Sequence, residues 1–72
     1  MTVVMVQIIQ TKLCGIHEVL IIEGKYKNFK GALIVPPTSN RIVYNGLRLY
    51  ATILRHEGQH VDLILNKTTE IM

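Results

Sequence analysis

The sequence predicts an all-β fold, a small closed barrel of five to six short strands. Three observations support this prediction. Apolar and β-branched residues form short runs of strand length, glycine, proline or asparagine stands between these runs, and no run has the polar face of an amphipathic helix. For a chain of 72 residues, a barrel is an economical way to leave no strand edge unpaired. We expect one domain that buries about 60% of its unfolded surface.

The N-terminal part of the chain contains two expected strands. Residues 1–10, MTVVMVQIIQ, are rich in β-branched residues, which favours a strand. Gly15 marks the turn that follows. Residues 17–23, HEVLIIE, are apolar on both faces, as is typical of a strand in the middle of a small barrel.

The stretch GKYKNFKG, residues 24–31, is expected to form a loop between two strands. Residues 32–35 return as a strand, which ends at the Pro36-Pro37 pair because proline cannot donate to a ladder. A short helix over residues 25–33 is the alternative, since three apolar side chains have helical spacing there. The two glycines that bracket the segment disfavour this helix.

The C-terminal half alternates between strands and turns. Residues 41–44 are expected to form a short strand, and Asn45-Gly46 predicts a type I′ hairpin turn, which needs two positive φ angles. Residues 47–55, LRLYATILR, alternate between apolar and polar faces. A second turn at Glu57-Gly58 leads to another alternating strand over residues 60–66.

Positive charge gathers in a part of the chain that has no acidic residue. Between residues 24 and 56 there is no Asp or Glu, and the basic residues there are Lys25, Lys27, Lys30, Arg41, Arg48 and Arg55. A stretch of one sign attracts polyanions such as nucleic acids. The alternative is a set of solvated loops and strand edges, where lysine also discourages aggregation.

The loop offers the best binding chemistry in the sequence. Lysine ammonium groups suit phosphate, and aromatic rings suit bases or apolar groups of a protein partner. The candidate binding residues are Lys25, Tyr26, Lys27, Asn28, Lys30, Arg41, Arg48 and Arg55. Gly24, Phe29 and Gly31 are interpreted mainly as residues that shape the loop, because Phe29 can plug the end of a barrel and glycine permits a close backbone approach.

The segments VLIIEG, KYKNF, KG and ALIV resemble the KOW motif of the C-terminal domains of the NusG and RfaH family. The matching positions are Gly24, Tyr26, Asn28, Phe29 and Gly31. The resemblance implies an SH3-like barrel over residues 16–72, preceded by a strand or linker in residues 1–15. It also implies a non-enzymatic, cytoplasmic module of transcription elongation, antitermination or the ribosome, with RNA or a ribosomal or transcription protein as its partner.

The second half of the chain is also similar to the first motif of Sm-like proteins, including Hfq. An Asn-Gly turn opens a long strand there, and an acidic turn precedes an apolar strand; the matching positions are Asn45, Gly46, Leu49, Ile53, Glu57, Val61 and Leu63. This resemblance implies an RNA-binding ring protein built on the same kind of barrel.

Residues 56–60 spell HEGQH, which matches the HExxH signature of zinc hydrolases. That chemistry needs a helix, because i, i+4 spacing on a helix places both imidazoles on one metal. Here the motif lies between two strand-patterned segments, so we interpret it as coincidental. Cys14 and His17 lack a third orienting group for nucleophilic catalysis. We expect no catalytic residue, metal, cofactor or small-molecule substrate.

The remaining signals concern the compartment. The apolar run of residues 3–9 is far shorter than the roughly 20 residues that span a bilayer, and it lacks the basic start of a signal peptide. Cys14 is the single cysteine, which excludes an internal disulfide and suits a reducing compartment. These features predict a cytoplasmic protein without a membrane partner.

Overall fold

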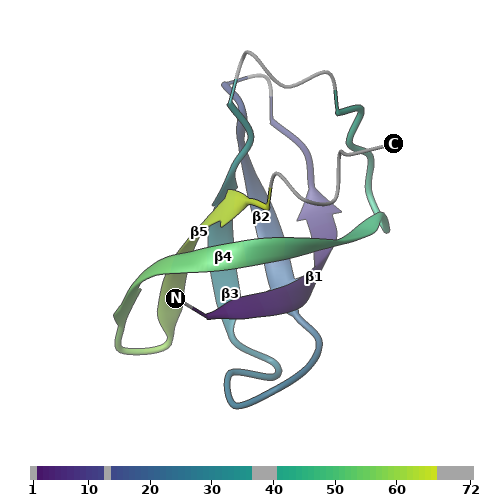
Figure 1. Ribbon diagram of the computed structural model, residues 1–72. Helices are drawn as coiled ribbons and strands as arrows, with labels where there is room; N and C mark the ends of the chain where they lie inside the picture. Colours follow the sequence, from purple (N-terminus) through teal and green to yellow (C-terminus); the bar gives the residue numbers. More distant parts are fainter. Residues whose placement is uncertain (1, 13, 37–40, 67–72) are drawn as a thin grey trace.

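A computed structural model describes residues 2–12, 14–36 and 41–66 of the chain (Figure 1). The fold is all-β, a small barrel that is SH3-like in size and closes with five strands, as the sequence predicts. The strands are β1 (Val3–Gln10), β2 (Ile16–Ile21), β3 (Lys30–Ile34), β4 (Arg48–Glu57) and β5 (His60–Leu65). Within the described ranges, no helix has the length and hydropathy needed to cross a membrane.

The order of the strands around the barrel is β1-β2-β3-β5-β4, and β4 pairs back with β1. Among the described strands, β3 and β5 run parallel and every other pair is antiparallel. The last strand is therefore inserted between the third and the fourth. A five-stranded Greek-key barrel of this order has the arrangement of the OB-fold.

β1 is an integral part of the barrel. It pairs with β2 through Val6–Gln10 and with β4 through Val3–Gln7. Alternate residues of a strand point to one face, so Val4, Val6 and Ile8 enter the core. β1, which lies in the segment expected as a strand or linker ahead of the barrel, thus forms part of the barrel wall.

The core is filled by the inward-facing residues of all five strands: Val4, Val6, Ile8, Val19, Ile21, Leu33, Leu49, Ala51, Val61, Leu63 and Leu65. Gly31 of β3 pairs with Val61 of β5. A Cβ atom at this position would lie 2.5 Å from the carbonyl oxygen of Val61, so only glycine fits without displacing the backbone. Gly31 thus belongs to β3, which begins at Lys30 rather than at Ala32 as expected.

Residues 41–44 do not form the expected strand. They lie outside every strand and are not paired in the barrel. Val43 packs against the core, whereas Ile42 is 80% exposed. The physical reason is that the five other strands already pair with one another around the barrel, which leaves no edge for this segment to join.

The Asn45-Gly46 turn also differs from the expected hairpin. The carbonyl of Tyr44 accepts a hydrogen bond of 3.0 Å from the N–H of Leu47. Of the two central residues only Gly46 has a positive φ, 92°, which is the pattern of a type II turn. Gly46 then donates to the carbonyl of Ile8, and Leu47 accepts from the N–H of Ile8, so the turn guides the chain onto β1 and into β4.

Candidate functional site

The loop between β2 and β3, residues 22–29, is closed by backbone hydrogen bonds. The N–H of Ile21 donates to the carbonyl of Phe29 at 2.9 Å, and the carbonyl of Ile21 accepts from the N–H of Asn28 at 2.7 Å. Asn28 and Phe29 together oppose Ile21, which is a β-bulge whose first residue is left-handed, with a φ of 74° at Asn28. Asparagine adopts this region more readily than most residues.

Two turns shape the rest of the loop. The N–H of Lys27 donates to the carbonyl of Gly24 at 3.2 Å, and the N–H of Phe29 donates to the carbonyl of Tyr26 at 2.9 Å. Gly24 has a φ of 82°, which a residue with a Cβ atom adopts only with strain. The segment 25–33 consequently forms turns followed by β3, and the alternative helix is absent from it.

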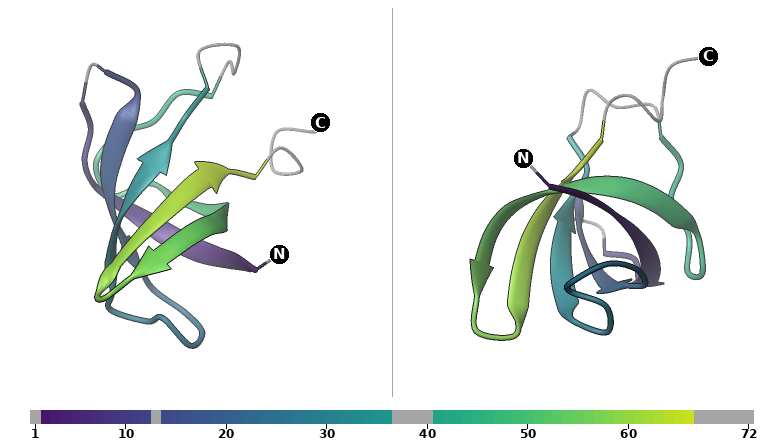
Figure 2. Two further views of the ribbon diagram at one scale, coloured as in Figure 1. Left: turned by 90° about the vertical axis from the view of Figure 1, so that its left-hand side faces the viewer. Right: turned by 60° about the horizontal axis from the view of Figure 1, so that its bottom comes forward.

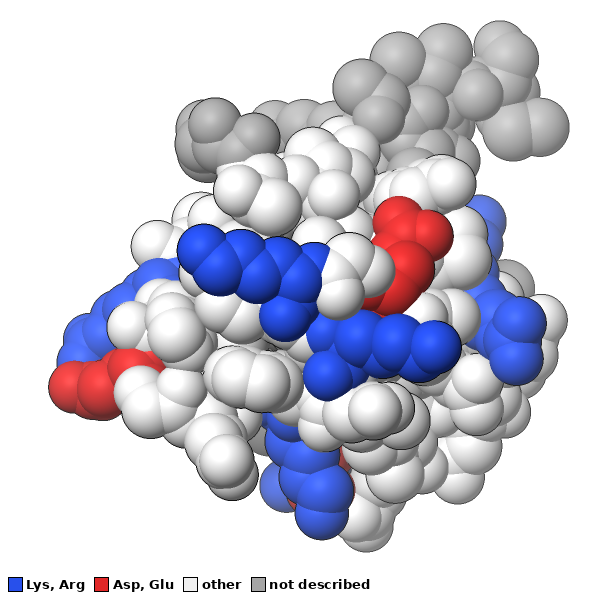
Figure 3. All heavy atoms as spheres, turned by 90° about the horizontal axis from the view of Figure 1, so that it is seen from below, with Lys and Arg blue, Asp and Glu red and all other residues white. Residues whose placement is uncertain are grey.

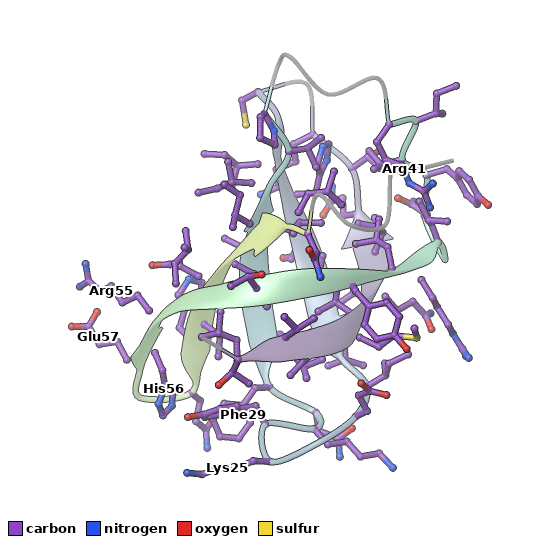
Figure 4. All side chains as sticks on the ribbon, viewed as in Figure 1. Lys25, Phe29, Arg41, Arg55, His56 and Glu57 are labelled. Carbon is purple, nitrogen blue, oxygen red and sulfur yellow. The ribbon has the colours of Figure 1, made fainter. Side chains whose placement is uncertain are left out.

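A cluster of three rings joins this loop to the β4–β5 hairpin. The Tyr26 ring lies 5.6 Å from that of Phe29 and 4.8 Å from that of His56, and Phe29 and His56 are 5.7 Å apart. Tyr26 and Phe29 are half-buried against the core. Figure 4 shows His56 and Phe29 side by side at one end of the barrel. Phe29 therefore packs against the core at this end of the barrel.

A second bulge explains how His56 reaches the cluster. The register of β4 against β5 shifts around Leu54, and an extra residue in one strand turns every later side chain to the opposite face. His56 consequently pairs with the buried Val61, whereas Arg55 pairs with Asp62 on the outer face. Simple alternation would have placed Arg55 inside and His56 outside.

An open hollow of about 440 Å³ lies between the loop and the hairpin, lined by Lys27, Asn28, Phe29, Lys30 and Gln59. Figure 2 shows the loop and the hairpin at the same end of the barrel. They meet there because β3 pairs with β5 in parallel, with Lys30 opposite His60. Gln59 has no sequence signal of its own, since only the strand order brings its turn beside the loop.

Positive charge predominates at this end of the barrel (Figure 3). Within the described part of the chain, the salt bridges join Arg55 to Glu57 and His60 to Asp62, and none involves a lysine. The lysine ammonium groups of the loop are therefore available to a ligand. That of Lys25 lies 5.7 Å from the centre of the Tyr26 ring, where a cation is attracted by the ring face.

The three candidate arginines lie outside the loop. Nε of Arg48 donates to the side chain of Gln7 at 3.1 Å, and Nη2 of Arg55 lies 3.0 Å from the Glu57 carboxylate. Arg41 is at the end of the barrel opposite Lys25 (Figure 4). The structure thus brings together five of the eight candidate binding residues, Lys25, Tyr26, Lys27, Asn28 and Lys30.

The HExxH residues form the end of β4, a two-residue turn and the start of β5. His56 is exposed and lies against the rings of Tyr26 and Phe29, and its Nε2–H donates to the carbonyl of Gly58 at 2.6 Å. His60 pairs with Glu57 on the outer face, and its Nε2 lies 3.0 Å from a carboxylate oxygen of Asp62. The two imidazoles thus lie on opposite faces of the hairpin. In the described ranges, no group of three or more His, Cys, Asp or Glu is placed to hold a metal ion.

Cys14 and His17, the other pair considered for catalysis, differ in burial and in hydrogen-bond partner. Nδ1 of the buried His17 accepts a hydrogen bond of 2.9 Å from the N–H of Lys12. Cys14 is exposed, and its thiol lies 3.8 Å from the carbonyl of Ile16. His17 consequently secures the connection between β1 and β2.

Comparison of the chain with models of known protein families gives no match, and comparison with curated proteins gives none either. The chemistry of the site is therefore read from its own residues. These are lysines without salt bridges, one half-buried aromatic ring and two exposed amides around a single hollow.

Proposed function

We propose that the chain is a non-enzymatic RNA-binding module that contacts RNA through the basic loop of residues 24–31. The observation that carries this proposal is the composition of the hollow, in which Lys27 and Lys30 are lining residues together with Phe29, and no lining residue is acidic. Ammonium groups bind phosphate as point charges. An aromatic ring offers a face to any base, and such a base–ring contact contributes about 1–3 kcal/mol.

The sequence resemblances support the same function. KOW modules and Sm-like proteins both include RNA binders, and the KOW resemblance centres on the loop that forms the hollow. It also supports a cytoplasmic module of the transcription or translation machinery. The OB-fold arrangement of strands is shared by many oligonucleotide-binding proteins, although this is an analogy of fold and does not by itself assign function.

The outer face of β2 and β3 is a less suitable surface for RNA than the loop. On that face Glu18 and Asp62 stand on either side of Ala32 in the ladder. Two carboxylates beside a small apolar residue repel phosphate. The charges therefore favour binding at the end of the barrel that carries Lys25, Lys27 and Lys30.

The test is a salt titration of binding to a labelled single-stranded RNA, followed by fluorescence anisotropy. Each phosphate contact with a single strand contributes about 0.7 to the slope of log affinity against log salt. We expect the Lys27→Ala/Lys30→Ala variant to bind at least about tenfold more weakly at low salt and with a shallower slope. The matched control, Arg48→Ala/Arg55→Ala, removes the same charge at side chains that already have partners, and should bind much as the wild type does.

Two results would contradict this proposal. Salt-insensitive binding, or an equal loss in both double variants, would remove the lysine-based RNA site. Recovery of one ribosomal or transcription protein from nuclease-treated lysate would then identify a protein partner instead. Light scattering separates the Sm-like alternative, because a hexamer or heptamer would indicate a ring and a monomer would exclude it.

A further inference from the structure

We infer that the hollow beside Phe29 holds one unstacked base of a single-stranded RNA, whose edge is read by the side-chain amides of Asn28 and Gln59. This inference rests on the proposed function and adds to it the form of the strand and the residues that read it. The lysines Lys27 and Lys30 hold the phosphates on either side of that base.

The dimensions of the hollow suit a single nucleotide. Its volume of about 440 Å³ lies within the range of roughly 300–1,000 Å³ that ligand sites occupy. Its walls come from the loop on one side and the turn of the β4–β5 hairpin on the other. In a duplex the base edges are paired and stacked, so only a single strand can insert a base between two such walls.

The two amides supply what a base edge requires. Each carries one carbonyl acceptor and an NH2 donor group, the combination that pairs with adjacent donor and acceptor atoms of a base. In the described part of the chain, no side-chain hydrogen bond engages either amide. Asn28 is also held by its backbone bond to Ile21 at 2.7 Å, so its side chain leaves from a fixed point.

The ring of Phe29 is fixed as well. It is held by Tyr26 at 5.6 Å and by His56 at 5.7 Å, measured between ring centres. A platform that is already ordered loses little conformational entropy when a base stacks on it. The ring, the amides and the two lysines together therefore match the three parts of a nucleotide that a protein can recognise: the base face, the base edge and the phosphate.

Two variants test the reading of the base without removing the lysines. Gln59→Ala alters an exposed turn residue, and Asn28→Gly removes the amide but keeps a residue that tolerates a positive φ. Gln10→Ala is the matched control, because Gln10 is exposed at the end of β1. Binding is measured for a single-stranded RNA, for the same sequence as a duplex, for four homopolymers and for AMP.

We expect the wild type to bind the single strand at least about tenfold more tightly than the duplex. Gln59→Ala and Asn28→Gly should each lose about three- to tenfold of the single-strand affinity and reduce the differences among homopolymers. Their salt slopes should stay unchanged, since the phosphate contacts remain. Gln10→Ala should behave as the wild type.

The outcomes separate this inference from the function on which it rests. Equal binding of duplex and single strand, or unchanged affinity in both amide variants while Lys27→Ala/Lys30→Ala still fails to bind, would overturn the base site and leave RNA binding intact. Tighter binding of AMP than of the oligonucleotide would overturn the assignment to a strand in favour of a free nucleotide. Absence of RNA binding in the wild type would refute both.

Discussion

The imidazole of His56 lies edge-on to the ring of Tyr26, with ring centres 4.8 Å apart. This contact joins the tip of the β4–β5 hairpin to the loop of residues 22–29, two segments that are distant in the sequence. The hollow between them exists only while both are held in place. The shape of the candidate site therefore depends on a residue that no motif for RNA binding would single out.

Replacing His56 by alanine should lower the free energy of unfolding by about 1 kcal/mol, because the ring contacts with Tyr26 and Phe29 are lost. Urea denaturation measures the loss, and amide hydrogen exchange at Asn28 should become faster as the loop loosens. His60→Ala is the control, since His60 is exposed, has no ring contact with Tyr26 or Phe29 among the described residues, and pairs with Asp62; it should change stability by less than about 0.5 kcal/mol. Equal effects of the two variants would contradict the role of the ring cluster.

Gly31→Ala should destabilise the barrel by about 1–3 kcal/mol through overpacking. The added methyl group would lie 2.5 Å from the carbonyl oxygen of Val61 and 2.7 Å from a methyl carbon of Leu63. Gly58→Ala provides the comparison, because no atom lies within 4 Å of its added Cβ and its cost of about 1 kcal/mol comes from the left-handed backbone alone. Urea midpoints should rank Gly31→Ala below Gly58→Ala, and the opposite order would show that β3 and β5 can separate easily.

The left-handed backbone at Asn28 allows a test of loop geometry. Asn28→Gly should leave the melting temperature nearly unchanged, because glycine adopts a φ of 74° without strain. Asn28→Ala should cost about 1 kcal/mol, which lowers the melting temperature of a domain of this size by about 4–8 °C. If alanine and glycine gave the same melting temperature, the bulge would not be the conformation of the loop in solution.

His17→Leu should destabilise the connection between β1 and β2 by about 1 kcal/mol, because the N–H of Lys12 loses its acceptor. The direct readout is hydrogen exchange of the Lys12 amide, which should become faster, while the core amide of Val19 keeps its protection relative to global unfolding. His60→Leu replaces an exposed histidine and is expected to leave the Lys12 amide unaffected. Unaltered exchange at Lys12 in His17→Leu would show that this hydrogen bond does not form.

Much of the barrel was predictable because its strands follow simple patterns. Alternation of buried and exposed side chains marked β5, the β-branched run marked β1, and glycines marked the turns. The predicted strand over residues 41–44 was wrong, because apolar character can be seen in the local sequence, whereas the lack of a partner strand cannot. The turn at Asn45-Gly46 was misassigned because Asn-Gly permits type I′, whereas contact with Ile8 selects the geometry observed.

The candidate site was only partly predictable for a different reason. Lys25, Lys27 and Lys30 are contiguous with the loop that presents them, so sequence proximity sufficed. Arg55 and His56 lie on the faces opposite to those that simple alternation predicts, because the register shifts at Leu54. No glycine, proline or asparagine marks this bulge in the sequence. The acid-free run ends just before Glu57. In the structure the carboxylate of Glu57 pairs with Arg55, so the charge of this arginine is already balanced.

The parallel pairing of β3 with β5 sets the order in which the barrel can assemble. β1 and β3 each pair with β2, but the second edge of β1 stays unpaired until β4 is in place, and that of β3 until β5 is in place. Loop closure over such distances is slow compared with the formation of local hairpins. Unpaired edges of β1 and β3 are thus exposed until these distant pairings form, which makes partly folded chains prone to aggregation.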